Sequence, residues 1–195
     1  MAEFILIHGG RHGAWCWALL EAELHKRGHR TYAMDLPIDQ PGIAIDGYVK
    51  SVLDFVAGKA ADDAFVVGHS MGGLVAPRVA LARPKARIIF LCAGFAHTSE
   101  AEQQENFAAA DPSYFQSLTV DARGLATLPD ALSIDAFYHD VPRDLALWAV
   151  SKLRPQWQAA YADVPPIAPY RERVAAIVDC ADDRVVIAER HAKLA

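Results

Sequence analysis

The chain has few cysteines and no long apolar segment. Its 195 residues include three cysteines, Cys16, Cys92 and Cys180, each inside an expected helix or strand. An odd number of cysteines placed in this way does not form a disulfide framework, so we expect reduced core thiols. Charged residues or glycines interrupt every apolar run, and none of these runs is long enough to span a membrane. These absences argue against a disulfide-stabilised secreted domain and against a transmembrane protein.

The sequence also lacks an excess of positive charge. Its 24 acidic residues outnumber its 19 lysines and arginines, which gives a net charge of −5. Without a basic stripe we expect no nucleic-acid partner. No spacing of cysteine and histidine is typical of a metal site, so we expect neither a metal nor a cofactor. The chain starts directly on an apolar strand without a basic leader, which favours a cytoplasmic protein with no membrane attachment.

What the chain does contain is a series of short apolar runs. Hydrophobic residues make up 53% of the chain, enough for one domain with a large core. Helix-like stretches alternate with strand-like runs at residues 4–7, 31–35, 65–67, 87–92 and 174–178. This alternation predicts an α/β fold in which helices cover both faces of a parallel sheet. Active sites in such folds lie beyond the carboxyl ends of the strands.

The strand pattern stops between residues 96 and 171. This part contains short helical stretches separated by prolines, at residues 112–118, 129–138 and 143–153, and no clear strand. An insertion of this length usually forms a lid over the site. The chain therefore divides into a first core part (1–95), a helical lid (96–171) and a second core part (172–195). Most bulky residues of the lid are expected in its own core, whereas Trp148 is expected to line the substrate pocket.

Residues 65–73, with the sequence FVVGHSMGG, carry the clearest motif. Three strand-favouring residues run into Gly-x-Ser-x-Gly, and an amphipathic helical segment follows at once. A strand, a tight turn and a helix in this order are typical of a nucleophile elbow, which predicts Ser70 as a nucleophile. Gly68 and Gly72 would leave room at the bend, and the helix N-terminus would favour a developing oxyanion. The alternative is a glycine-rich turn with a purely structural role.

A glycine-rich loop, HGGRHGAW at residues 8–15, follows the first strand. Glycines at this place let backbone N–H groups approach a ligand closely. We expect the N–H groups of Gly10 and Met71 to form an oxyanion hole, with Gly9 and His69 beside the substrate. The alternative is a flexible connection between a strand and a helix.

With these motifs the chain resembles the α/β-hydrolase superfamily, and within it the branch of plant methyl esterases, hydroxynitrile lyases and bacterial esterases. The resemblance implies Ser70 as the nucleophile and Asp183, rather than Asp182, as the acid of a catalytic triad. It also implies Gly10 and Met71 as the oxyanion donors. The segments that carry the resemblance are HGGRHGAWCW (8–17), GHSMGG (68–73), FYHDVP (137–142), LRPQ (153–156) and CADDR (180–184).

The sequence departs from this family at the histidine that activates the serine. In the family this histidine follows the acid after one more strand. Only 12 residues follow Asp183 here, and residues 185–194 are expected to form one helix. His191 in that helix would lie roughly 12 Å from the catalytic edge of the sheet, too far to act as the base. The other candidates, none of them favoured by its position, are His69, His97 and His139.

Gly9 stands where lyases of this branch have threonine, a departure that favours ester hydrolysis over cyanohydrin cleavage. We therefore expect a serine hydrolase that acts on small carboxylic esters through an acyl-enzyme on Ser70. Because the base is not identified, two alternatives stay open: a binding protein for a small ester or apolar ligand, and a truncated version of a longer enzyme. The missing final strand would leave residues 174–178 at the edge of the sheet, where a second copy could pair to form a homodimer.

Overall fold

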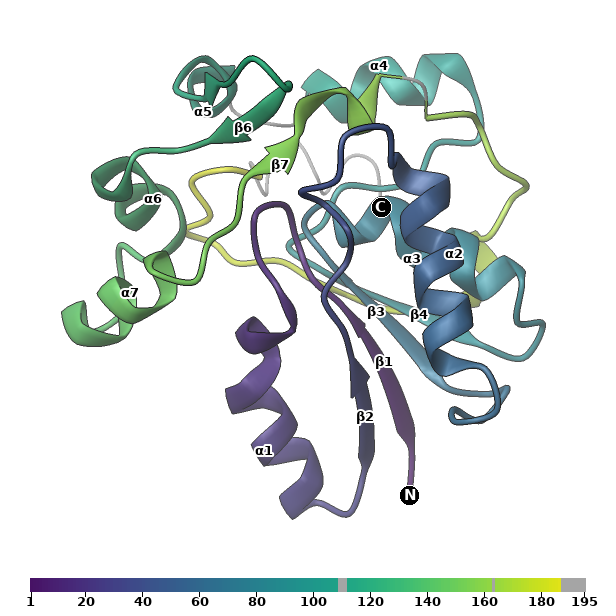
Figure 1. Ribbon diagram of the computed structural model, residues 1–195. Helices are drawn as coiled ribbons and strands as arrows, with labels where there is room; N and C mark the ends of the chain where they lie inside the picture. Colours follow the sequence, from purple (N-terminus) through teal and green to yellow (C-terminus); the bar gives the residue numbers. More distant parts are fainter. Residues whose placement is uncertain (109–111, 163, 187–195) are drawn as a thin grey trace.

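A parallel β-sheet forms the centre of the molecule (Figure 1). The computed structural model describes residues 1–108, 112–162 and 164–186. The sheet consists of β1 (Glu3–Ile7), β2 (Arg30–Ala33), β3 (Phe65–His69), β4 (Arg87–Leu91) and β8 (Val174–Val178). These strands lie in the order β2-β1-β3-β4-β8, and each neighbouring pair is parallel. The predicted parallel α/β sheet is therefore confirmed.

Helices cover both faces of this sheet. A short 3₁₀ helix, η1 (Ala14–Trp17), continues into α1 (Ala18–Lys26), whereas the sequence predicted one helix over residues 14–27. On the opposite side of the sheet lie α2 (Ile45–Val56) and α3 (Gly72–Leu81), as Figure 1 shows. This arrangement confirms the prediction that both faces are covered.

The alternation of side chains along β1 and β3 supplies two core layers. On one face Leu6 and Val67 pack with Trp17 of η1. On the other face Ile5 and Val66 join a larger cluster that includes the buried residues of α2 and the buried valines and Ala76 and Ala80 of α3. The buried residues of α2 recur at helical spacing, which makes this segment an amphipathic helix; they are Ile45, Tyr48, Val52 and Val56.

The inserted segment, residues 96–171, connects the neighbouring strands β4 and β8. It contains α4 (Glu100–Ala108), α5 (Pro112–Gln116), α6 (Asp130–Phe137), α7 (Arg143–Val150) and the 3₁₀ helix η2 (Gln158–Tyr161). The three predicted helical stretches are confirmed with shorter bounds.

The prediction that the inserted segment has no strand was wrong. Three short strands, β5 (Thr119–Val120), β6 (Leu125–Thr127) and β7 (Gln156–Trp157), form a small antiparallel sheet in the order β5-β6-β7. Strands of two or three residues are too short to show an alternating pattern. Along the chain, α6 and α7 lie between β6 and its partner β7, so the local sequence does not reveal this pairing.

The chain returns to the main sheet through the 3₁₀ helix η3 (Arg171–Arg173) and β8. Of the described strands, β8 lies at one edge of the sheet, as predicted. The helix predicted over residues 185–194 does not begin where expected, because Val185 and Val186 are not helical. The remainder of that helix, with His191, lies outside the described residues.

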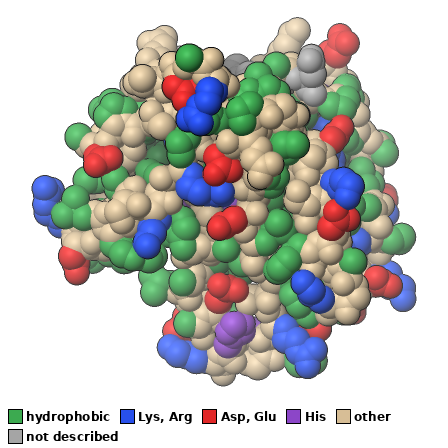
Figure 2. All heavy atoms as spheres, in the orientation of Figure 1, with side chains coloured by type: hydrophobic (Ala, Val, Ile, Leu, Met, Phe, Trp, Pro, Cys, Tyr) green, Lys and Arg blue, Asp and Glu red, His purple; other side chains and the backbone are tan. Residues whose placement is uncertain are grey.

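The surface in view mixes charges of both signs. On the face shown in Figure 2, acidic and basic side chains are interspersed, and no continuous basic area is visible. None of the helices within the described ranges combines the length and the apolar character that a membrane span needs. All three cysteines are free thiols, but Cys180 is exposed in the loop after β8, so its expected place in the core was wrong.

Candidate active site

Ser70 occupies a sharp backbone bend between β3 and α3. Its φ of 50° lies in the left-handed region, which costs a residue with a side chain on the order of 1–3 kcal/mol. Hydrogen bonds hold the bend in place: Ser70 N–H donates to Leu91 O (3.3 Å), and Ser70 O accepts from Gly73 N–H (3.0 Å) and Gly94 N–H (3.2 Å). A strained serine between a strand and a helix has the geometry of a nucleophile elbow.

The glycines around this bend are required by close backbone contacts. A Cβ on Gly68 would lie 2.5 Å from Gly72 O, and a Cβ on Gly72 would lie 2.4 Å from Ile7 O. A Cβ on Gly73 would lie 1.9 Å from Gly94 O. Such distances leave no room for any side chain. The prediction that Gly68 and Gly72 leave room at the bend is therefore confirmed.

Ser70 opens onto a cavity of about 1130 Å³ between the sheet and the inserted segment. Two of the predicted pocket residues, His69 and Trp148, line it. Gly9 is buried instead behind the serine, where a Cβ would lie 2.9 Å from Ser70 Cβ. Much of the wall is aromatic, with contributions from Trp15, Tyr114, Phe115, Phe137 and Tyr138. The cavity therefore suits a ligand with apolar parts.

The two N–H groups expected to form an oxyanion hole are both unpaired within the described ranges. Gly10 and Met71 line the cavity together with Ser70. Neither Gly10 N–H nor Met71 N–H donates a hydrogen bond to any described residue. Met71 directly precedes α3, whose N-terminal end favours negative charge. Both groups are thus free to donate to a ligand oxygen.

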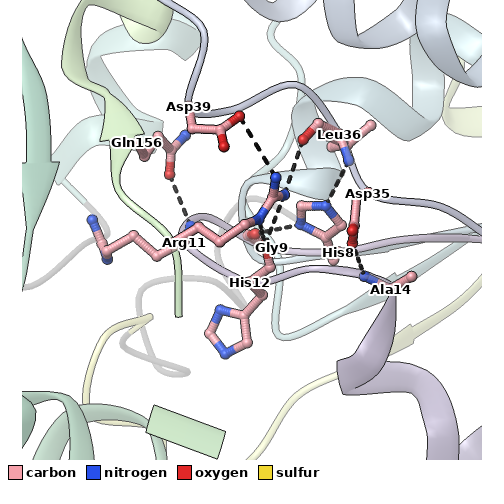
Figure 3. Close-up of polar contacts among 10 residues, drawn as sticks. His8, Gly9, Arg11, His12, Ala14, Asp35, Leu36, Asp39 and Gln156 are labelled. Atoms are coloured by element: carbon pink, nitrogen blue, oxygen red, sulfur yellow. Dashed lines mark hydrogen bonds and ion pairs between the residues drawn. The ribbon is translucent and has the colours of Figure 1, made fainter. Parts of the chain in front are cut away.

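Two neutral histidines, His8 and His12, fix the loop that carries Gly10, and Figure 3 shows the hydrogen bonds of the His8 ring. His8 Nδ1–H donates to Gly9 O (2.8 Å), and His8 Nε2 accepts from Leu36 N–H (2.9 Å). His12 Nδ1–H donates to Gly10 O (2.7 Å), so its Nε2 accepts from Tyr138 O–H (2.8 Å). These bonds use both ring nitrogens of each histidine.

Burial keeps these rings uncharged. Desolvation lowers the pKa of His8 to about 4 and that of His12 to about 3, against an ordinary value of 6.5. Both rings are therefore neutral near pH 7. Each acts as a structural support of the loop rather than as a proton carrier.

The inserted segment clamps the same loop from the other side (Figure 3). Gln156 of β7 is 1% exposed; its Oε1 accepts from Arg11 N–H (3.1 Å), and its Nε2 donates to Tyr161 Oη (2.7 Å). Arg154 donates from its backbone to Arg11 O (2.8 Å) and from its guanidinium to His12 O (3.1 Å). Sequence reasoning missed this clamp, because its members lie more than a hundred positions from the loop. The only sequence signal for Arg154 and Gln156 was that LRPQ (153–156) is one of the segments that resemble the family.

Asp183 also lines the cavity, in the loop after β8. Its Oδ1 accepts hydrogen bonds from Val185 N–H and Val186 N–H, both at 2.8 Å. Asp182, the alternative acid, is exposed. The structure therefore brings Ser70, Asp183 and the two N–H groups to one cavity.

Within the described ranges, no histidine is bonded in a way that would let it act as the base for Ser70. No described histidine hydrogen-bonds to Ser70 or to Asp183. His69 packs its ring against His12 and Trp17, at centroid distances of 5.9 and 6.2 Å, and burial lowers its pKa to about 4. His97 and His139 line the cavity without a hydrogen bond to either residue, and His191 lies outside the described part.

Comparison with known proteins agrees with this geometry. The chain is 35% identical to Methylesterase 7 of Arabidopsis thaliana over 102 residues, which cover 47% of this chain and 39% of that protein. It is 33% identical to the carbendazim hydrolyzing esterase of Nocardioides over 87 residues, 41% of this chain and 36% of that protein. The chain thus spans less than two-fifths of these relatives.

Solved structures match over more of the chain. The crystal structure of a methylesterase from Arabidopsis superposes with a TM-score of 0.79 at 21% identity, covering 100% of this chain and 84% of that one. Similarity at this identity shows the shared fold. The model of the alpha/beta hydrolase family matches residues 4–195. The chain therefore belongs to the alpha/beta hydrolase family.

Proposed function

We propose that this protein is a serine hydrolase that acts on small carboxylic esters, with Ser70 as its nucleophile. The observation that carries the proposal is the strained Ser70, at φ 50°, which opens onto the cavity beside two N–H groups that bond to no described residue. A strained conformation persists only where the surrounding structure enforces it, and such residues cluster at functional sites. The esterase names of two relatives support the same reaction class.

In the proposed reaction Ser70 Oγ attacks the ester carbonyl carbon. The carbonyl oxygen becomes an oxyanion, which Gly10 N–H and Met71 N–H stabilise by hydrogen bonds. Loss of the alcohol gives an acyl-enzyme, and water then releases the acid. None of these steps requires a metal or a cofactor. The pocket residues His69 and Trp148 would contact the acyl or alcohol group.

The proton of Ser70 needs an acceptor when the hydroxyl attacks. Asp183 would orient a histidine that takes this proton, but no described histidine hydrogen-bonds to it. Removing a member of a triad costs on the order of 10⁴- to 10⁶-fold in turnover. The lack of a described histidine bonded to Asp183 therefore favours a second candidate, a ligand-binding protein that keeps the cavity without turnover.

One experiment separates the two. The protein is incubated with p-nitrophenyl acetate and, separately, with a fluorophosphonate probe, and Ser70→Ala is the control. Release of p-nitrophenol and labelling that both depend on Ser70 would support the hydrolase. Absence of both in a folded protein would overturn it in favour of the binding protein.

A further inference from the structure

Arg11 carries a buried charge that has no counter-ion within the described part of the chain. Arg11 and Arg78 are 7% and 8% exposed, so both guanidinium groups are largely shielded from water. Arg78 has a partner, since its Nε lies 3.7 Å from Asp46 Oδ1. No described carboxylate lies within ion-pair distance of Arg11. Burying a charge is costly unless it is paired, so this exception calls for an explanation.

The groups around the Arg11 guanidinium do not replace a counter-ion. The rings of Tyr114 and Phe137 lie 4.9 and 5.8 Å from its Cζ, and their cation–π attraction is weaker than a bidentate bond to a carboxylate. Arg11 Nε is buried and has no hydrogen-bond partner among the described residues. Burial lowers the pKa of Arg11, but a guanidinium stays charged at neutral pH.

Arg11 is also held next to the reacting groups. It directly follows Gly10, the proposed oxyanion donor, and it lines the same cavity as Ser70. Its backbone is fixed on both sides, by Gln156 Oε1 (3.1 Å) and by Arg154 N–H (2.8 Å). The backbone of Arg11 therefore has a set position relative to the place where an ester carbonyl would bind, and the rings of Tyr114 and Phe137 lie against its guanidinium.

The remaining described acidic and basic residues of the cavity wall do not compete for this role. Asp140, Asp182 and Arg184 are exposed, and Arg184 already pairs with Asp135. Asp183 accepts two backbone N–H groups. An anion that enters this mostly apolar cavity would find Arg11 as a buried cation that no described carboxylate pairs.

We propose that Arg11 binds a free carboxylate on the substrate, so that the preferred ligand is the half-ester of a dicarboxylic acid. This inference rests on the proposed function, because it assigns the ester group to Ser70 and the acid group to Arg11. The planar guanidinium can donate two parallel hydrogen bonds to a carboxylate, which a neutral ester cannot accept in the same way. The apolar wall would cover the carbon chain between the two groups.

The test measures binding separately from turnover. Protein with Ser70→Ala, which leaves the ester intact, is titrated with monomethyl esters of glutaric to suberic acid and with the matching dimethyl esters. Binding is followed by the fluorescence of the tryptophans, of which Trp15, Trp17 and Trp148 line the cavity. We expect at least one monomethyl ester to bind about tenfold or more tightly than its dimethyl counterpart, as for a hydrogen bond to a charged group.

Variants assign this preference to Arg11. Arg11→Met in the same background should bring the ratio of the two affinities close to one, and Arg11→Lys should restore part of it. Arg27→Met, at an exposed arginine that pairs with Glu23, is the matched control and should keep the full ratio. Melting curves of each variant should confirm that it is folded. Equal affinity for both ester types, or a preference that survives Arg11→Met, would overturn the inference.

Turnover is assayed in parallel on the protein that retains Ser70. A preference for half-esters without any hydrolysis would remove the proposed function and leave the carboxylate site standing. Hydrolysis of neutral esters without any preference for half-esters would support the proposed function and overturn the carboxylate site.

Discussion

The sulfur atoms of Cys92 and Cys180 lie 3.0 Å apart, although the residues are separated by 88 positions in the chain. Cys92 directly follows β4 and Cys180 follows β8, and Cys92 N–H donates to Val178 O (2.8 Å). The contact therefore joins the ends of two neighbouring strands. It also ties the loop that carries Asp183 to the strand beside the Ser70 bend.

This contact predicts unequal thiol reactivity. Burial, with the adjacent Cys180 thiol, raises the pKa of Cys92 to about 12, and burial likewise raises that of Cys16 to about 12. A raised pKa leaves little thiolate near pH 8, and the thiolate is the form that reacts. Because Cys180 is exposed, iodoacetamide should alkylate it well before Cys92 and Cys16, as measured by peptide mass spectrometry over time. Equal rates for Cys92 and Cys180 would contradict the buried position of Cys92.

Gly9 leaves room for the nucleophile rather than for the substrate. Gly9→Ala would place a Cβ 2.9 Å from Ser70 Cβ, so the bend or the loop must shift. We expect fluorophosphonate labelling of Ser70 to slow by about tenfold or more, since small displacements of reacting groups are costly. The free energy of unfolding should fall by about 1–3 kcal/mol, measured by urea denaturation. Gly94→Ala, whose Cβ meets no atom within 4 Å, should keep its stability and is the matched control.

Sequence alone was sufficient for the parts of this site that depend on local pattern. Ser70 stands between an apolar strand and a helix, and Gly68 and Gly72 bracket it, so the bend follows from nearby residues. The parallel sheet followed in the same way from the alternation of strands and helices. Each of these features is encoded within a few tens of residues.

The missed features all depend on contacts between distant segments. Gln156 binds Arg11 across 145 positions, and β7 pairs with β6 only after α6 and α7 have intervened. The charge of Arg11 could be read from the sequence, but the absence of a counter-ion among the described residues depends on which carboxylates pack nearby. Such partners are set by tertiary packing, which periodicity does not report.

The clamp at Gln156 yields a further prediction. Gln156→Leu would leave the buried Arg11 N–H without its acceptor and would remove the donor to Tyr161. An unsatisfied buried donor costs about 1–3 kcal/mol, so the free energy of unfolding should fall by this amount in urea denaturation. Labelling of Ser70 should slow as well, because the loop with Gly10 loses its support. Gln158→Leu, whose side chain has no hydrogen bond to a described residue, should change stability much less.

The place of β8 at the edge of the described sheet makes a homodimer testable. Edge strands present unpaired backbone groups that can pair with a second chain, and Val178 at the end of β8 is 46% exposed. We propose that two copies pair along this edge, and size-exclusion chromatography with light scattering should then report a dimer. Val178→Lys should shift the equilibrium to the monomer, because a charge on an edge strand opposes pairing. A strict monomer in the unchanged protein would contradict the proposal.

The free energy of unfolding should fall as the pH drops below neutrality, because three histidines are buried in their neutral form. Burial lowers the pKa of His8 and His69 to about 4 and that of His12 to about 3, below the ordinary value of 6.5. Between these values the unfolded chain binds more protons than the folded one, so acid favours unfolding. Urea denaturation at pH 7 and pH 5 should reveal a loss on the order of 1–2 kcal/mol per histidine. His12→Gln should reduce this pH dependence, whereas His25→Gln, at an exposed histidine, should not. An unchanged pH dependence in His12→Gln would show that the His12 ring is not buried in its neutral form.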